Sequence, residues 1–336
     1  SGHWEFYHDY LYSTIEVEGQ EYIVKPMNCL GHILIYKTRL HSYRELPLRY
    51  AELGTVYRYE RSGVLHGLAR VRGFTQDDAH IFCRFDQLED EVAGVLELAR
   101  FMTDTFGFSN YQVLLSTRPE KYAGTIPVWE EATDTLCRAM ARLGMDYKVD
   151  PGEGVFYGPK IDIKFEDAVG RAWQGPTIQV DFNLSQRFNV TYVGEDGRGH
   201  QVVMVHRTVL GSMERFLASL IEHYGGVFPV WLAPVQVKVI PIADRHLDYA
   251  RKLEVELKNQ GVRAEVDARS ERVNLKIRQA QIDKIPYMLV VGDKEIADNA
   301  VTVRLRTGGQ LPSQSFASFK KAVLKVIKNK VKDLKL

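Results

Sequence analysis

The sequence contains few cysteines and no long hydrophobic run. Only three cysteines, Cys29, Cys83 and Cys137, occur in 336 residues, and such a sparse, odd set does not build a disulfide framework. No stretch approaches the ~20 consecutive apolar residues that span a bilayer. The first residues also lack the basic start and apolar run of a secretory signal. We therefore expect a cytoplasmic protein with reduced thiols and no membrane association.

Two common phosphate-binding motifs are also missing. The sequence holds no Gly-x-x-x-x-Gly-Lys-Ser/Thr loop, and no Gly-x-Gly-x-x-Gly follows a predicted strand. A P-loop enzyme or a dinucleotide-binding fold is therefore not indicated. Any nucleotide must be bound by a different arrangement.

The charge of the chain is unevenly distributed. From residue 229 onward there are 21 Lys and Arg against 12 Asp and Glu, a net charge of +9, whereas residues 1–228 carry a net charge of −8. A basic C-terminal part suits contact with a polyanion such as nucleic acid. Seven of its lysines lie between Lys320 and Lys335, so a solvated lysine-rich tail explains the charge equally well.

Residues 1–229 have the pattern of a mainly antiparallel sheet with helices. Residues 55–60 and 74–82 are rich in β-branched and aromatic residues, and the arginine-containing loop between them predicts a hairpin. Capping-box spacing at Asp86 and Glu89 predicts a helix to Gly107. Further strands are expected within 160–166, 172–182 and 201–206, with a helix over 208–224. Strands outnumber βαβ units, which favours an α+β fold.

Residues 230–336 have a different pattern and predict a second domain. Two prolines, Pro229 and Pro234, interrupt the chain before strands and helices begin to alternate. We expect a small α/β domain with a mixed sheet and a final basic amphipathic helix over 316–334.

Three side chains are candidates for binding a metal. Cys29, His80 and His206 each lie in a polar cluster, and one thiolate with two imidazoles would leave one position of tetrahedral Zn²⁺ open for a substrate. Taken singly, each residue fits a buried packing role better, and sequence spacing alone does not join them.

Three arginines are candidates for binding a triphosphate. The planar guanidinium groups of Arg58, Arg70 and Arg215 can form paired hydrogen bonds to phosphate and can stack on a base. Surface solvation is the alternative for any arginine. Arg58 lies within the apolar-aromatic strand predicted over 55–60, and Arg215 lies on a predicted helix with a core face, so both are costly to bury.

Four ordered segments resemble the threonyl-tRNA synthetases, a family of class II aminoacyl-tRNA synthetases. They are Lys25-Pro-Met-Asn-Cys29, Val56-Tyr-Arg-Tyr-Glu60, the run from Gly67 to His80, and Leu210-Gly-Ser-Met-Glu-Arg215. The similarity continues from Phe156 to Lys160 and reaches Glu295, so it covers nearly the whole chain. It implies a catalytic domain over 1–229 and an anticodon-binding domain over 230–336.

The resemblance implies a zinc-dependent choice of threonine. Cys29, His80 and His206 would hold one Zn²⁺, which the amino and hydroxyl groups of threonine both ligate, so that valine is rejected. Asp78, Tyr157 and Gln179 would contact threonine.

The resemblance also implies residues that bind ATP together with Mg²⁺. Arg58 would lie at the α-phosphate, while Arg70 and Arg215 would hold the rest of the nucleotide. The other expected nucleotide contacts are Glu60, Phe74, Gln76, Gln174 and Thr177. Threonine would then displace pyrophosphate from the α-phosphorus.

Transfer of threonine to tRNA(Thr) would involve further residues. His3 matches a histidine that helps to deprotonate the terminal ribose, although a histidine so near the chain start can equally be mobile and non-catalytic. Glu295 and Arg304 match anticodon-base contacts.

The resemblance leaves three further expectations. The family forms homodimers, but the segment that builds the interface begins upstream of Gly2, so dimerisation is an open question here. We expect no serine-editing domain. A class II synthetase for serine or proline and a non-catalytic RNA-binding paralogue are the rival interpretations, and the complete set of candidate arginines and ligands argues against the paralogue.

Overall fold

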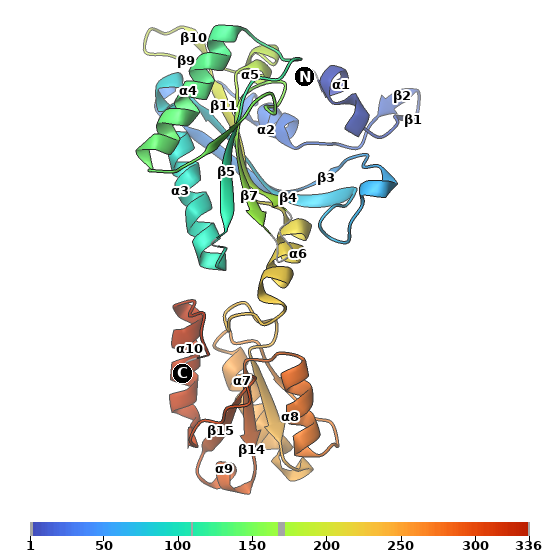
Figure 1. Cartoon of the computed structure of the whole chain (residues 1–336), viewed down its shortest axis with the longest axis vertical. Coiled ribbons are helices and arrows are strands. Elements are labelled where there is room, and N and C mark those ends of the chain that lie inside the picture. The colour runs from blue at the N-terminus through green and yellow to red at the C-terminus, as the bar shows by residue number, and fades with distance from the viewer. Residues whose placement is uncertain (1–2, 109, 167–171, 335–336) are drawn as a thin grey trace. The chain divides into compact units, whose positions relative to one another are not determined.

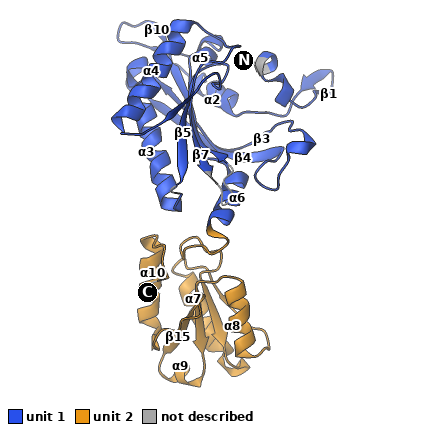
Figure 2. Cartoon of the chain, in the orientation of Figure 1, with its two compact units in different colours: residues 1–223 blue, residues 224–336 orange. Residues whose placement is uncertain are grey.

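The computed structural model describes residues 3–108, 110–166 and 172–334. The chain divides into two compact units, residues 1–223 and 224–336 (Figure 2). The division lies near the proline-containing segment from Phe228 to Pro234. Each unit has its own hydrophobic core.

The first unit is built on one twisted sheet (Figure 1). Among its described residues this sheet has seven strands in the order β3-β4-β11-β8-β7-β5-β6, and every neighbouring pair is antiparallel except β5 with β6. The strands are β3 (Leu48–Tyr57), β4 (Gly73–Cys83), β5 (Tyr111–Ser116), β6 (Lys148–Asp150), β7 (Lys160–Glu166), β8 (Ala172–Asp181) and β11 (Val203–Ser212).

Two long helices, α3 (Leu88–Phe106) and α4 (Ile126–Arg142), cover one face of this sheet (Figure 1). Their apolar stripes, with Leu96 and Leu136, pack on inward side chains such as Ile81, Ile161 and Ile178. Helix α3 ends at Gly107, whose positive φ of 82° suits a left-handed C-terminal cap. Burial of this face stabilises the scaffold.

The opposite face of the sheet is only partly covered. Helices α2 (Cys29–Tyr36) and α5 (Asn183–Arg187) lie there, and Ile33 and Tyr36 pack with Phe82 and Met204. The remaining elements of the unit are α1 (His3–Phe6), β1 (Ile15–Val17), β2 (Gln20–Tyr22), β9 (Thr191–Val193), β10 (Gly199–Gln201) and α6 (Met213–Tyr224), whose last residue lies in the second unit. Part of the sheet on this side is therefore not covered by a helix.

The second unit is a small α/β domain with a mixed sheet. Its strand order is β13-β12-β14-β15-β16, with parallel pairing among the first three strands and antiparallel pairing beyond them. The strands are β12 (Val237–Pro241), β13 (Ala264–Val266), β14 (Tyr287–Val291), β15 (Ala300–Leu305) and β16 (Gln314–Ser315). The helices are α7 (Leu247–Lys258), α8 (Val273–Ile282), α9 (Asp293–Ala297) and α10 (Phe316–Lys328). Helices α7 and α10 pack on one face, and α8 packs on the other.

The expected fold class is confirmed, and two helix boundaries are wrong. The mixed α/β architecture, rich in antiparallel pairing, matches the prediction. Helix α6, however, begins at Met213 instead of 208, because residues 208–212 continue strand β11 through an irregular register. The final helix α10 ends at Lys328 instead of 334, because the chain turns at residues 329–330, where Lys330 has a φ of +49°. In the described residues no helix is long and apolar enough to cross a membrane.

The core of the first unit provides a direct stability test. Leu96 is fully buried on α3, whereas Leu98 on the same helix is 39% exposed. We expect Leu96→Ala to lower the free energy of unfolding by about 2–5 kcal/mol, through lost burial and a residual cavity. Leu98→Ala should lower it by less than about 1 kcal/mol. Urea unfolding measures both, and equal losses would contradict the packing described above.

Candidate active site

Four neighbouring strands place polar side chains on the partly covered face of the sheet. Side chains alternate between the two faces of a strand, so each strand gives every second residue to this face. These residues are Gln76, Asp78 and His80 on β4, His206 and Thr208 on β11, Thr177 and Gln179 on β8, and Lys160 and Asp162 on β7. The register sets His80 opposite His206 and His206 opposite Gln179. Polar residues from distant parts of the sequence thus form continuous rows.

Two adjoining cavities lie over these rows. One has a volume of about 240 Å³, and the other has a volume of about 160 Å³. They share a wall formed by Arg58, Gln76, Thr177, Gln179 and Thr208. A ligand in either cavity can therefore contact these five side chains.

The smaller cavity contains the predicted metal ligands. Cys29, His80 and His206 are all buried, and their potential ligand atoms lie within 4.8 Å of one another. Cys29 comes from the start of α2, and the two histidines come from β4 and β11. This group of one sulfur and two ring nitrogens fits a borderline-soft ion such as Zn²⁺ with an open position.

Neighbouring groups orient the two histidine rings. Nε2 of His206 lies 2.8 Å from a carboxylate oxygen of buried Asp181, and Nδ1 of His80 lies 2.7 Å from Nδ1 of His32. The other nitrogen of each ring is the one that would bind a metal ion. Burial lowers the pKa of His80 well below its usual value, so its imidazole is neutral, as a metal ligand requires.

The predicted threonine contacts also line the smaller cavity. Asp78, Tyr157 and Gln179 belong to its wall, and the Tyr157 hydroxyl donates a hydrogen bond to Gln179 Oε1. The amide of Asn28 donates to Asp78 at 3.0 Å, and Lys25 donates to Asn28 at 2.7 Å. Burial raises the pKa of the Asp78 carboxyl, while its bond from Asn28 opposes that rise. An ammonium group is the partner that would best compensate this buried carboxylate.

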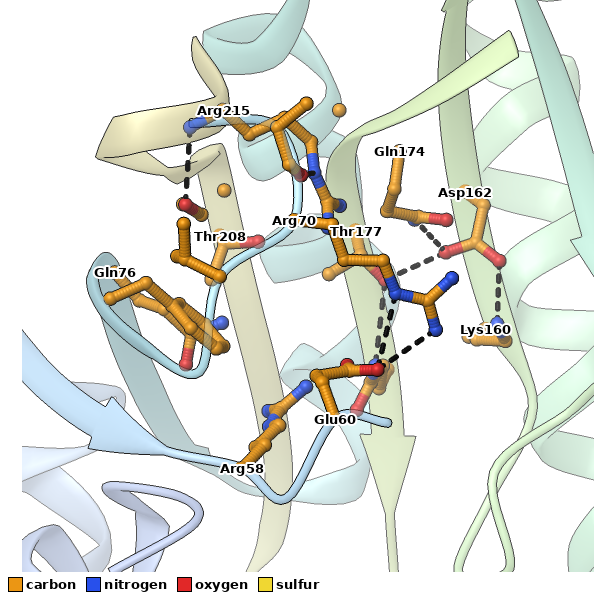
Figure 3. A pocket seen from close by; sticks show the side chains of 17 residues that line it. Arg58, Glu60, Arg70, Gln76, Lys160, Asp162, Gln174, Thr177, Thr208 and Arg215 are labelled. Carbon is orange, nitrogen blue, oxygen red and sulfur yellow. Dashed lines mark hydrogen bonds and ion pairs between the residues drawn. The ribbon is translucent and has the colours of Figure 1, made fainter. Parts of the chain in front are cut away.

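The three predicted arginines surround the larger cavity (Figure 3). Arg58 donates from Nε to the carbonyl of Pro26 at 3.2 Å, and its guanidinium lies 5.2 Å from the centre of the Phe74 ring. Arg215 donates from Nε to the carbonyl of Ala69 at 2.7 Å. Burial, with the charges of Arg70 and Arg58, lowers the pKa of Arg215. Three guanidinium groups around one cavity favour an anionic ligand.

The remaining nucleotide candidates line the same cavity. They are Glu60, Phe74, Gln76, Gln174 and Thr177. Glu60 is paired with Arg70 at 3.0 Å, so an incoming phosphate competes with this carboxylate for Arg70 (Figure 3). The sequence analysis missed Lys160 and Asp162, which form an ion pair of 2.7 Å in the cavity wall. Asp162 also accepts hydrogen bonds from Gln174 and Thr177 and thereby positions both. Lys160 and Asp162 alternate with apolar residues on β7, and this alternation is the sequence signal that both side chains lie on one face of the strand.

Asp77 accounts for the unexpected start of α6. Its carboxylate accepts hydrogen bonds from the backbone amides of Val209, Leu210 and Gly211 at 2.9–3.0 Å. This fixes an irregular turn at the end of β11, where Gly211 has a φ of +76°. The chain then enters α6, which carries Arg215 toward the larger cavity.

Three further hydrogen bonds hold the start of α6. Ser212 Oγ accepts from the amide of Arg215 at 3.2 Å and donates to Glu214 at 2.9 Å. Glu214 in turn accepts from the amide of Thr75 on β4 at 3.1 Å. Strand β4 therefore positions both ends of the segment that leads to Arg215.

The remaining predicted residues lie elsewhere. In the second unit, Glu295 on α9 accepts from the amide of Gly292 and from Thr302 Oγ1 at 2.8 Å. Arg304 lies on β15 two residues after Thr302, on the same face of the strand. The side chain of His3 lies outside the described part of the structure.

Both units match known domain families. Residues 12–224 match the class II core domain of tRNA synthetases for G, H, P, S and T, and residues 236–326 match an anticodon-binding domain. The RNA-binding domain of threonyl-tRNA synthetase from Cryptosporidium parvum Iowa II is similar in structure, with a TM-score of 0.92 and 40% identity over 97% of this chain and 82% of that one. The chain belongs to the threonyl-tRNA synthetase family.

Other members of the threonyl-tRNA synthetase family show the same relationship. A protein described as putative threonyl-tRNA synthetase ThrRS-1 from Aeropyrum pernix has a TM-score of 0.80 and 31% identity, over 99% of this chain and 81% of that one. Threonine--tRNA ligases are 66% identical in Dehalococcoides mccartyi strain BAV1 and 56% identical in Nitrosococcus oceani. The matches cover 98% and 95% of this chain but 56% and 50% of those proteins. The chain spans about half the length of the curated relatives it matches.

The role of Asp77 can be tested by hydrogen exchange and unfolding. We expect Asp77→Ala to leave three amides without an acceptor and to lower the free energy of unfolding by about 3 kcal/mol or more. The amides of Val209, Leu210 and Gly211 should then exchange faster. Asp86→Ala, at a largely exposed aspartate that follows β4, should change stability by less than about 1 kcal/mol. Unchanged exchange of the three amides in Asp77→Ala would refute the role of this carboxylate.

Proposed function

We propose that this chain is a threonine--tRNA ligase that activates threonine with ATP and transfers it to tRNA(Thr). The observation that carries the proposal is the shared wall between a cavity with a Cys-His-His group and a cavity with three arginines. Activation joins a carboxylate to the α-phosphorus of ATP, so it needs two binding sites that meet at one reacting atom.

The smaller cavity suits an amino acid that has both an amine and a hydroxyl group. A Zn²⁺ ion on Cys29, His80 and His206 would supply a Lewis-acidic centre for these two groups. Asp78 lies in the same wall and would pair with the ammonium or amine of threonine. Tyr157 and Gln179 would orient the substrate through their mutual hydrogen bond. Valine has no hydroxyl group and would leave the site incompletely satisfied.

Arg58 is placed to assist the reaction between threonine and ATP. It lines both cavities, so its guanidinium can contact the threonine carboxylate and the α-phosphate together. The carboxylate oxygen forms a bond to the α-phosphorus while the bond to the β-phosphate bridge breaks, and pyrophosphate leaves. Negative charge that develops on the α-phosphate oxygens would be stabilised by Arg58.

The other residues of the larger cavity would hold the nucleotide. Arg70 and Arg215 would bind the phosphates and stack on the adenine, with Phe74 on its other side. Glu60, Gln76, Gln174 and Thr177 supply hydrogen-bonding groups around the same space. Mg²⁺ bound with ATP would neutralise part of the triphosphate charge.

The second step would transfer threonine to the terminal ribose of tRNA(Thr). We assign His3 as the residue that helps to remove the ribose proton, on the family resemblance alone. The anticodon-binding domain over 230–336, which lies within the second unit, would read the anticodon through Glu295 and Arg304. A carboxylate and a guanidinium would offer an acceptor and a donor to an unstacked base.

Amino-acid activation can be measured by ATP–pyrophosphate exchange. We expect exchange with threonine, weaker exchange with serine and none with valine, because the valine side chain lacks a hydroxyl group. Removal of zinc with a chelator should abolish exchange, and added zinc should restore it. Full exchange in a zinc-free protein, or exchange with valine equal to that with threonine, would overturn the proposed site.

Anticodon reading can be separated from activation. We expect Arg304→Ala to raise the KM for tRNA(Thr) in aminoacylation by roughly 5- to 150-fold, as loss of one base contact does, without change in ATP–pyrophosphate exchange. Arg251→Ala, at an exposed arginine of α7, is the control and should change the KM by less than about threefold. An equal effect of both substitutions would show that general charge, not base contact, accounts for the result.

A further inference from the structure

The side chains of Glu52, His32 and His80 form a chain that runs from the surface to the predicted metal ligand His80. Nε2 of His32 lies 3.3 Å from a carboxylate oxygen of Glu52, and Nδ1 of the same ring lies 2.7 Å from Nδ1 of His80. The His32 side chain is 5% exposed, and that of Glu52 is 37% exposed. His32 is therefore a buried imidazole held between a carboxylate and the ring of His80.

The ring protons of His80 and His32 can be arranged in one productive way. A nitrogen that binds a metal carries no proton, so a His80 ring that binds through Nε2 must carry its proton on Nδ1. That proton is donated to Nδ1 of His32, which must then be the acceptor. His32 accordingly carries its own proton on Nε2, which faces the Glu52 carboxylate at 3.3 Å.

The fold positions each member of the chain separately. Glu52 lies on β3 opposite Asp78, two residues from Tyr50, which lies opposite His80. His32 lies one helical turn after Cys29 on α2, so the helix that supplies the sulfur also supplies the partner of the imidazole. On the other side of the cluster, the Asp181 carboxylate contacts His206 directly, without an intervening histidine.

We propose that His32 and Glu52 are positioning residues that fix the ring orientation and tautomer of His80 for metal binding. The inference rests on the proposed zinc site. Glu52 is a positioning residue because its carboxylate contacts the imidazole of His32 and does not line the substrate cavity. Partners of this kind typically change metal affinity by roughly 10- to 100-fold.

The test measures zinc affinity of the whole chain by competition with a chromophoric chelator. We expect Glu52→Ala to weaken zinc binding by roughly 10-fold or more, because His32 loses its acceptor. Glu52→Gln keeps an acceptor oxygen and should restore binding to within about threefold of the parent chain. In a His32→Phe background, Glu52→Ala should add no further loss.

A matched control is available in the same unit. Glu45 is 35% exposed and lies 3.0 Å from Nδ1 of His41, a buried histidine that is not among the predicted ligands. Glu45→Ala should leave zinc affinity unchanged, and thermal unfolding would verify that every variant is folded. This control separates loss of a carboxylate–histidine pair in general from loss of the pair at His80.

The outcomes are distinguishable. Equal zinc affinity in Glu52→Ala and the parent chain, or equal weakening by Glu52→Gln and Glu52→Ala, would overturn the positioning role and leave the zinc site intact. A further loss from Glu52→Ala in the His32→Phe background would also overturn it. A parent chain that binds no zinc would overturn both the site and this inference.

Discussion

The antiparallel pairing of β4 with β11 is the constraint on which the candidate site depends. This register sets His80 opposite His206 and Asp78 opposite Thr208, while pairing of β11 with β8 adds Gln179 and Thr177 to the same rows. A slip of one residue would turn these side chains into the core beneath α3 and α4. Burial of the core therefore fixes this register, because Ile81, Val205 and Ile178 are buried only in the observed pairing.

The site also contains charged side chains whose clustering and burial are unfavourable when no ligand is bound. Three arginines share the larger cavity, and the pKa of Arg215 is lowered by burial and by the charges of its neighbours. In the smaller cavity, Asp78 is a buried carboxylate whose pKa is raised by that burial. A substrate that brings phosphates to the first cavity and an ammonium group to the second would compensate both sets of charges. Arg58 and Gln76 in the shared wall would then contact both parts of the ligand.

Much of the fold could be predicted from periodicity, because alternation on strands and apolar stripes on helices are local signals. The mixed α/β domain at the C-terminal end and the helix that ends at Gly107 are examples. The boundary between β11 and α6 could not be predicted in this way. It is set by Asp77, which comes from another strand and binds the amides of residues 209–211.

The spacing of residues in the sequence did not show which of them form the site together. Cys29, His80 and His206 lie far apart in the sequence, and family resemblance, not pattern, suggested that they act together. The structure brings them within 4.8 Å of one another. Lys160 and Asp162 were missed because a charged pair on a strand looks like a solvated edge until its neighbours β5 and β8 are known. Local sequence patterns thus predict helices and strands, whereas the register between strands determines which side chains come together in the site.

A crystal structure of the chain with zinc and a non-hydrolysable threonyl-adenylate analogue would test the central claim most directly. The account predicts the threonyl amine and hydroxyl at a metal held by Cys29, His80 and His206, and the phosphate mimic beside Arg58 in the shared wall. The adenosine part should lie in the larger cavity near Arg215. An analogue bound elsewhere, or bound in these cavities with its phosphate mimic away from Arg58, would contradict the account.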